Sequence, residues 1–249
     1  MNLLHIDLET TPATALVWAL REQTISIDQI VTPTSVLCFA AKWHGDKDVQ
    51  FYKSQKQEGP AFERMITKAH ELLSQADVVC HFNGNSFDIP RLNTEFVKLG
   101  MRPPPPFANI DLKNVVMRKF AMTSSKLAFV GPFLKIGAKV NHEGWDLWKD
   151  CMKGEAKAWA VMEKYNIQDV VLLEKLYNRV LPWIDNHPNR NLFVDSEEPV
   201  CTNCGKATLQ KRGEAVTTTQ RYTRYACTTC GRWCRGRNAL KPKRPVAVR

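Results

Sequence analysis

The order of strand-like and helix-like segments restricts the fold of this chain more than any other feature of its sequence. Apolar runs of strand length come first, at residues 2–8, 36–43 and 49–52. Helix-like and strand-like segments then alternate, and only helical periodicity remains from residue 112 to residue 181. Such an order predicts an α/β domain with a mixed sheet flanked by helices. Two further strands are expected at residues 78–82 and 109–112, and helices at residues 61–74, 86–99, 112–121, 124–136 and 155–181.

The composition fits one sizeable globular domain with a small appendage. The hydrophobic share is 44% and the charged share is 24%, both ordinary for a globular protein. No apolar run approaches the roughly 20 residues of a membrane span, and no basic leader precedes an apolar stretch at the N-terminus. We therefore expect a cytoplasmic protein without a membrane partner. The expected parts are an α/β domain over residues 1–182, a linker over 183–199, a cysteine-rich β domain over 200–236 and a disordered basic tail over 237–249.

Two acidic side chains end the first predicted strand. Asp7 and Glu9 are two residues apart, so on a strand they point to the same face, while Ile6 and Leu8 point to the other. Neighbouring carboxylates repel unless a cation lies between them. The pair therefore indicates a site for a hard divalent cation, although such a pair also occurs by chance on surface strands.

Two more acidic residues follow apolar segments further along the chain. Asp88 comes after the loop that starts at Asn83 and opens a predicted helix, where helix capping is an alternative role for it or for Ser86. Tyr165 and Asp169 are one helical turn apart within the longest helical segment. A surface Tyr–Asp pair is the alternative there.

Together these residues resemble the three motifs of the DEDDy subfamily of ribonuclease H-like 3′→5′ exonucleases, the superfamily that includes the proofreading domains of DNA polymerases. The resemblance covers about residues 1–182. The matching residues, in chain order, are Asp7-Leu-Glu9, Asn83-x-x-x-Phe87-Asp88 and Tyr165-x-x-x-Asp169.

The residue before the last acidic motif separates two subfamilies. The related DEDDh subfamily has a histidine five positions before its last aspartate, and this chain has Lys164 there. His142 lies too far from Asp169 in the sequence to match that histidine. The resemblance is therefore to the tyrosine-containing subfamily.

The resemblance implies catalysis by two Mg²⁺ or Mn²⁺ ions. Asp7 would bridge both ions, Glu9 and Asp169 would complete the first site, and Asp88 would hold the second. Tyr165 would orient the attacking water, because a phenol with a pKa near 10 is a poor base at neutral pH.

The implied substrate is nucleic acid, in particular single-stranded 3′ ends. Asn83 would contact a phosphate or sugar, and Phe87 would pack near the terminal base. DNA is favoured over RNA because the second motif looks most like that of polymerase proofreading domains. The chain would act alone or beside a polymerase or other replication partner.

Four cysteines near the C-terminus form two pairs with metal-ligand spacing. Cys201 and Cys204 make one Cys-x-x-Cys-Gly sequence, and Cys227 and Cys230 make the other. Pairs of this kind, with strand-like residues between them, indicate one structural tetrahedral Zn²⁺, and the segment resembles a zinc ribbon. Cys234 lies beyond the second pair and is not expected to be a ligand.

Basic charge is concentrated in the same region. Residues 195–249 hold 12 of the 35 Lys and Arg residues but only 4 of the 25 Asp and Glu residues. Cations alternate there with aromatic residues, which favours contact with phosphates and bases. The alternatives are an aromatic ribbon core with solvated cations, and docking of a protein partner. The candidate substrate contacts are Arg221, Arg224 and Tyr225.

Three functions fit these features. The first is a metal-dependent 3′→5′ exonuclease whose ribbon helps to bind the substrate. The second is a structure-directed nuclease with the same metal site, which would cut flaps or junctions. The third is a nucleic-acid-binding adaptor with an inert nuclease domain, although the presence of all four acids argues against this.

Overall fold

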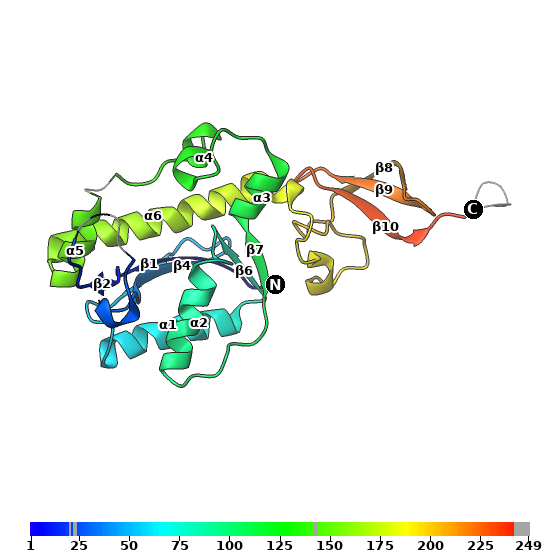
Figure 1. The fold of residues 1–249 in the computed structure, drawn as a ribbon. Helices are drawn as coiled ribbons and strands as arrows, with labels where there is room; N and C mark the ends of the chain where they lie inside the picture. Colours follow the sequence, from blue (N-terminus) through cyan, green and yellow to red (C-terminus); the bar gives the residue numbers. More distant parts are fainter. Residues whose placement is uncertain (20, 22–23, 142–143, 242–249) are drawn as a thin grey trace. The chain divides into compact units, whose positions relative to one another are not determined.

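The computed structural model describes the chain except for residues 20, 22–23, 142–143 and 242–249 (Figure 1). The chain divides into two compact units. One is Asn2–Tyr177, and the other is Asn178–Arg249 together with Met1. Within the described residues, no helix combines the length and the apolar character needed to cross a membrane.

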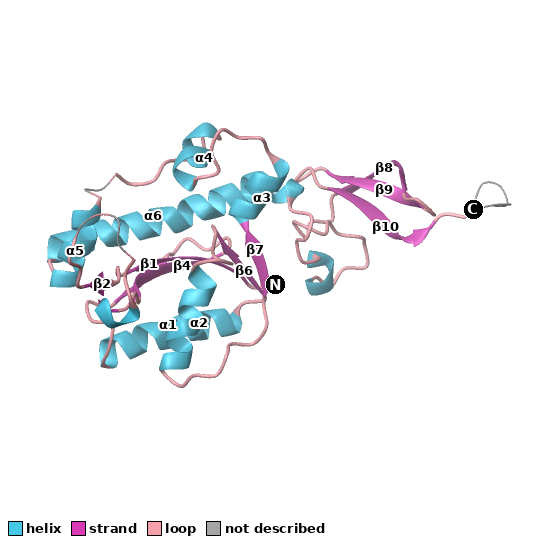
Figure 2. Cartoon of the chain, viewed as in Figure 1, coloured by secondary structure: helices cyan, strands magenta, loops and turns pink. Residues whose placement is uncertain are grey.

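The first unit contains a mixed sheet, whose strands are drawn in magenta in Figure 2. Its five strands have the order β5-β4-β1-β6-β7. β1 and β4 are antiparallel, as are β4 and β5, whereas β6 runs parallel to both β1 and β7. The prediction of a mixed sheet flanked by helices is therefore confirmed. The strands are β1 (Leu3–Thr10), β4 (Val36–Trp43), β5 (Gln50–Lys53), β6 (Val78–His81) and β7 (Ala108–Asp111).

Helices cover both faces of this sheet. α1 and α2 lie on one face, and α6 lies on the other (Figure 1). The alternation of β1 explains the division, because Leu4, Ile6 and Leu8 join the core formed with α1, while Asp7 and Glu9 face α6. The helices are α1 (Pro60–Gln75), α2 (Asp88–Lys98), α3 (Leu112–Lys119), α4 (Leu127–Phe133), α5 (Trp145–Lys153) and α6 (Ala156–Val180).

The structure corrects the helix predicted at residues 124–136. α4 covers only Leu127–Phe133, because Lys135 and Gly137 adopt positive φ angles of 55° and 136° that end a right-handed helix. α5 was not predicted from the sequence.

The segment between β1 and β4 forms a small hairpin that the sequence analysis did not identify. It contains β2 (Thr14–Ala15), the 3-10 helix η1 (Ile27–Gln29) and β3 (Ile30–Thr32). Trp18 on this hairpin is fully exposed. The hairpin strands are short and mostly exposed, so their periodicity is too weak to predict.

The second unit contains an antiparallel three-stranded sheet with the order β10-β9-β8. The strands are β8 (Leu209–Val216), β9 (Arg221–Cys227) and β10 (Trp233–Ala239). β10 therefore includes residues 237–239, which the sequence analysis assigned to the tail, because Ala239 pairs with Tyr222 and extends the ladder. The rest of that tail, at residues 242–249, lies outside the described residues.

The segment predicted as a linker contains ordered turns. It holds the end of η2 (Leu181–Trp183) and all of η3 (Arg190–Phe193). The Asn203 side chain donates to the carbonyl oxygens of Leu181 and Ile184 at 2.8 and 3.2 Å. These bonds fix the segment against the cysteine-rich residues of the same unit.

Candidate functional site

The candidate site begins where β1 separates from β6. The two strands pair only through residues Leu3 to His5 of β1, whereas pairing of β1 with β4 continues to Thr10. Asp7 and Glu9 lie on this second half of β1 and face α6. The sheet therefore opens on one side of the strand that carries both acids.

Asp88 reaches the same strand from the loop after β6. Asn83 in this loop has a φ of 73°, and a Cβ added at Gly84 would lie 2.4 Å from Cγ of His81. The tight loop directs Asp88, at the start of α2, towards β1. Its Oδ1 accepts a hydrogen bond from the Leu8 N–H at 3.1 Å. The Asp88 carboxylate therefore links α2 to β1, so its role is not limited to capping a helix.

The third part of the site comes from α6. Tyr165 and Asp169 are buried on the face of α6 that packs on the sheet, whereas Lys164 is exposed. Carboxylate oxygens of Asp7, Glu9 and Asp169 all lie within 4.8 Å of one another. The structure thus brings together three acids that are up to 162 positions apart in the chain.

Asn166 holds the Asp7 side chain in place, and Asn166 was not identified from the sequence. Its side-chain amide donates to Oδ2 and to the backbone oxygen of Asp7 at 2.8 and 3.2 Å. Asn166 is three residues before Asp169 in α6, so helical periodicity places both on one face. That spacing is the signal that could have identified it.

Lys139 is a second residue that the sequence analysis did not identify. Its Nζ lies 2.5 Å from Oδ2 of Asp169 and donates to the Tyr165 hydroxyl at 3.1 Å. It belongs to the irregular segment between α4 and α5, where no periodicity indicates which side chains point inward. The ammonium offsets part of the negative charge of the three acids.

Burial and crowding change the protonation of this site. Burial, followed by the charges of Asp88, Asp169 and Glu9, raises the pKa of Asp7 well above its usual value. Burial raises the pKa of Glu9 to about 7 against the opposing effect of Lys139. Burial likewise raises the pKa of Asp88 to about 7, although the Leu8 N–H opposes the shift.

Tyr165 responds to the same environment. Burial, followed by the charges of Glu9 and Asp169, raises the pKa of its phenol. The hydroxyl therefore stays protonated at neutral pH and can only donate or accept hydrogen bonds. Buried carboxylates beside a neutral phenol match the oxygen donors that Mg²⁺ and Mn²⁺ prefer, so the residues present fit such ions.

The two predicted substrate contacts near Asp88 differ in exposure and pairing. Phe87 is 39% exposed and directly precedes Asp88. The Asn83 side-chain oxygen accepts from Nζ of Lys113 at 3.1 Å. Lys113, on α3, is a cation beside the site that the sequence analysis did not include.

The four predicted zinc ligands lie together in the second unit. Sγ of Cys201 is 3.6 Å from that of Cys230, and Sγ of Cys204 is 3.6 Å from that of Cys227. Thiolates bound at about 2.3 Å to a tetrahedral zinc ion would be about 3.8 Å apart. This cluster of four cysteines in a three-stranded unit suggests a zinc-ribbon-like module.

The predicted substrate residues of this unit lie on its central strand, β9. Arg221 pairs with Glu214 at 2.6 Å, and the guanidinium of Arg224 lies over the Trp233 ring at 5.1 Å. Strand alternation places Arg221 and Tyr225 on one face and Arg224 on the other. The three residues therefore do not form one continuous surface.

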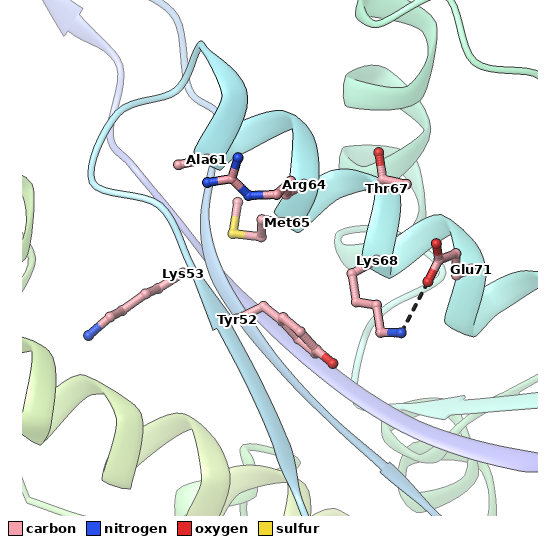
Figure 3. Close-up of a pocket in the computed structure, with 8 residues that line it drawn as sticks. All are labelled: Tyr52, Lys53, Ala61, Arg64, Met65, Thr67, Lys68 and Glu71. Carbon is pink, nitrogen blue, oxygen red and sulfur yellow. Dashed lines mark hydrogen bonds and ion pairs between the residues drawn. The ribbon is translucent and has the colours of Figure 1, made fainter.

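A separate pocket of about 510 Å³ lies between β5 and α1 (Figure 3). Figure 3 shows an ion pair between Lys68 and Glu71 at its wall, with 3.0 Å between the charged atoms. Its described lining includes none of the four acids, so the pocket is distinct from the candidate metal site. The lining residues are Tyr52, Lys53, Ala61, Arg64, Met65, Thr67, Lys68 and Glu71. His142, which the sequence analysis set aside, lies outside the described residues.

Comparisons with known proteins agree with this fold. Residues 31–181 match the model of the RNase H superfamily, a span that contains Asp88 and Asp169 but starts after Asp7 and Glu9. The structure is similar to that of the family B DNA polymerase from the hyperthermophilic archaeon Pyrobaculum calidifontis, with a TM-score of 0.53 and 18% sequence identity. The similarity covers 73% of this chain and 24% of the polymerase chain, and it shows the fold alone. No curated protein matches the sequence.

Proposed function

Because the chain belongs to the RNase H superfamily, we propose that it is a metal-dependent 3′→5′ exonuclease of the DEDDy kind. The convergence of Asp7, Glu9 and Asp169, whose oxygens lie within 4.8 Å of one another, carries this proposal. Asp88 adds a fourth carboxylate through its bond to β1. Residues 1–182 would form the exonuclease domain.

The four acids would hold two Mg²⁺ or Mn²⁺ ions. When bound, the ions would supply an activated water and charge stabilisation at the leaving 3′-oxygen. Asp7 would contact both ions, Glu9 and Asp169 the first, and Asp88 the second. Ionisation of the crowded carboxylates is unfavourable in the metal-free protein, so each bound cation favours their charged form.

Other residues would position the reacting groups. Asn166 holds the Asp7 carboxylate through a bond of 2.8 Å. Tyr165 would orient the attacking water through its neutral hydroxyl. Lys139 bonds both Tyr165 and Asp169, so it keeps these two side chains in one arrangement.

Nucleic acid would approach from the loop that precedes α2. Phe87 is exposed enough to pack on a terminal base, and the pair formed by Asn83 and Lys113 offers polar contacts to the sugar-phosphate backbone. We propose single-stranded 3′ ends as the substrate, with DNA preferred to RNA, and a polymerase or other replication protein as a partner.

The second unit would be a zinc ribbon that assists substrate binding. Zn²⁺ would be bound by Cys201, Cys204, Cys227 and Cys230 and would stabilise a unit too small for a large core. Eight more basic than acidic residues between positions 195 and 249 favour binding to a phosphate backbone.

The test is digestion of 5′-labelled single-stranded DNA and RNA oligonucleotides by the purified full chain with Mg²⁺. A ladder that shortens from the 3′ end is expected, with faster loss of DNA. Discrete internal products would favour the structure-directed nuclease, and a gel shift without cleavage would favour the adaptor.

Variants connect this activity to the acids. Asp7→Asn and Asp169→Asn should abolish the ladder, while Asp48→Asn, at an exposed position of the same unit, should keep the wild-type rate. Wild-type cleavage by a folded Asp7→Asn variant would refute the assignment of the site.

A further inference from the structure

A second group of metal-binding side chains lies in the first unit, away from the four acids. The donor atoms of His5, His44 and Glu174 all lie within 4.8 Å of one another. The three residues come from β1, from the turn after β4 and from α6. No step of the proposed exonuclease reaction uses them.

The spacing of these donor atoms fits a tetrahedral ion. Nε2 of His5 is 3.2 Å from Nδ1 of His44, and Nδ1 of His44 is 3.3 Å from Oε1 of Glu174. Nitrogen and oxygen ligands bound at 2.0–2.2 Å to tetrahedral zinc would be about 3.4 Å apart. Both separations are close to the edge of a zinc coordination shell, and the third pair of donor atoms, from His5 and Glu174, lies within 4.8 Å.

Hydrogen bonding alone accounts less well for the same contacts. Nδ1 of His44 faces both the imidazole of His5 and the carboxylate of Glu174. If Nδ1 carries a proton, that one proton must serve both contacts; if it does not, its lone pair faces the carboxylate oxygen. A cation among the three atoms would be favourable for all of them.

The surroundings hold Glu174 ready for such a cation. Its Oε2 pairs with Nζ of Lys42 at 2.6 Å, and its Oε1 accepts from the Gly45 N–H at 2.8 Å. These bonds fix the carboxylate so that Oε1 faces the histidines, as partners of metal ligands commonly do.

The histidine rings are fixed as well. Tyr177 contacts both rings edge-on, with centroids 5.4 Å from that of His5 and 5.0 Å from that of His44. His5 is fully buried, whereas the side chains of His44 and Glu174 are 22% and 15% exposed. An ion could therefore enter from the side of His44 and keep one water ligand.

We propose that His5, His44 and Glu174 bind one zinc ion, with a water as the fourth ligand. Two imidazoles and a carboxylate form a donor set that zinc accepts readily. This site is independent of the proposed nuclease activity and of the cysteine cluster.

The ion would join the two elements that carry most of the acids. His5 is two residues before Asp7 on β1, about 7 Å along the strand. Glu174 is five residues after Asp169 on α6, about 7.5 Å along the helix. The zinc site and the acidic site thus each bring together side chains from β1 and α6, and the two sites are neighbours. Bound zinc would hold these two elements together beside the acids.

The test counts zinc in the full chain after dialysis against zinc-free buffer that contains excess Mg²⁺. The wild type should retain one more equivalent than His44→Ala, because each variant keeps its cysteine cluster. His70→Ala, a histidine on α1 away from the site, is the matched control and should retain the wild-type amount. His44→Cys should restore the ion, since thiolate is also a zinc ligand.

Affinity and stability give a second readout. Loss of a residue that merely supports a metal ligand weakens binding about 10–100-fold, so His44→Ala should weaken zinc binding at this site at least as much. After removal of all metal with a chelator, Zn²⁺ added in the presence of excess Mg²⁺ should raise the melting temperature of the first unit more in the wild type than in His44→Ala. Equal zinc content and equal melting shifts in wild type and His44→Ala would overturn the proposal.

A spectroscopic measurement on the wild type covers the case in which the variants do not fold. Co²⁺ replacing zinc should first give the thiolate-to-cobalt charge-transfer band of the cysteine cluster. A second equivalent should then add the visible absorption of tetrahedral cobalt without a further rise in that band. A titration that ends after the first equivalent would also overturn the proposal.

Discussion

Replacement of Asp88 by asparagine should make the metal-free protein more stable at pH 8 while it removes the proposed activity. The Asp88 side chain is 3% exposed, and burial raises its pKa from 3.8 to about 7. Asparagine has nearly the same shape and can still accept the hydrogen bond from Leu8, but it never ionises.

The sign and size of the effect follow from the pKa shift. Between pH 4 and pH 7 the native protein keeps a proton on Asp88 that the unfolded chain has lost, so the stability of the wild type falls as the pH rises. Each pKa unit corresponds to about 1.4 kcal/mol. From pH 5 to pH 8 the wild type should therefore lose about 3 kcal/mol relative to Asp88→Asn, with most of the loss below pH 7.

The assay is urea denaturation of both proteins without Mg²⁺ at pH 5 and pH 8, followed by the helical circular dichroism signal. Asp48→Asn, which removes an exposed carboxylate of the same unit and keeps Asp88, is the control and should lose stability with rising pH as the wild type does. Added Mg²⁺ at pH 8 should stabilise the wild type more than Asp88→Asn. A stability difference between wild type and Asp88→Asn that does not change with pH would refute this account of the site.

Four further changes test other parts of the structure. Tyr165→Phe should slow Mg²⁺-dependent nucleotide release by up to about 10-fold, the value of one hydrogen bond, and an unchanged rate would show that the hydroxyl only packs. Lys139→Met should lower the free energy of unfolding of the metal-free protein by about 2 kcal/mol. The loss should be smaller in Mg²⁺, because the Lys139 ammonium and Mg²⁺ neutralise the same carboxylates. An equal loss with and without Mg²⁺ would contradict this role of the ammonium. Gly84→Ala should destabilise the protein by about 1–3 kcal/mol because the new Cβ would lie 2.4 Å from the His81 ring, and an unchanged denaturation midpoint would refute that contact. Arg224→Ala should weaken DNA binding and reduce the slope of log affinity against log salt concentration by about 1, whereas an unchanged slope would place Arg224 outside the nucleic-acid contact.

Regular segments of the fold could be predicted from the sequence because a simple local pattern marks each of them. β4 is a continuous apolar run of strand length, α1 repeats its apolar residues at helical spacing, and the structure places both elements within one residue of the predicted bounds. α5 is short, at nine residues, and residues 134–141, which precede it, form no helix or strand. Its position depends on packing against β4 and α6, which periodicity does not describe.

In the candidate site, likewise, some residues could be predicted from local sequence patterns and others could not. The acids could be proposed from the sequence because each belongs to a motif with a fixed local spacing. The role of Lys139 depends instead on its tertiary contacts with Tyr165 and Asp169, whereas the spacing of Asn166 from Asp169 on α6 could have identified Asn166. The cluster of His5, His44 and Glu174 depends most clearly on tertiary contacts, because His5 and Glu174 are 169 positions apart and neither lies in a recognisable motif.

The bond between the Leu8 amide and the Asp88 carboxylate gives this protein an internal reporter. β1 pairs with β6 only as far as His5, so beyond that point a side chain, rather than a neighbouring strand, protects the Leu8 N–H. Exchange of this hydrogen with deuterium therefore depends on the state of a single carboxyl group. Protonation of Asp88, or its capture by a metal ion, would change both the exchange rate and the magnetic resonance frequency of this amide. One backbone signal would thus follow the occupancy of the acidic site without substrate and without a mutation.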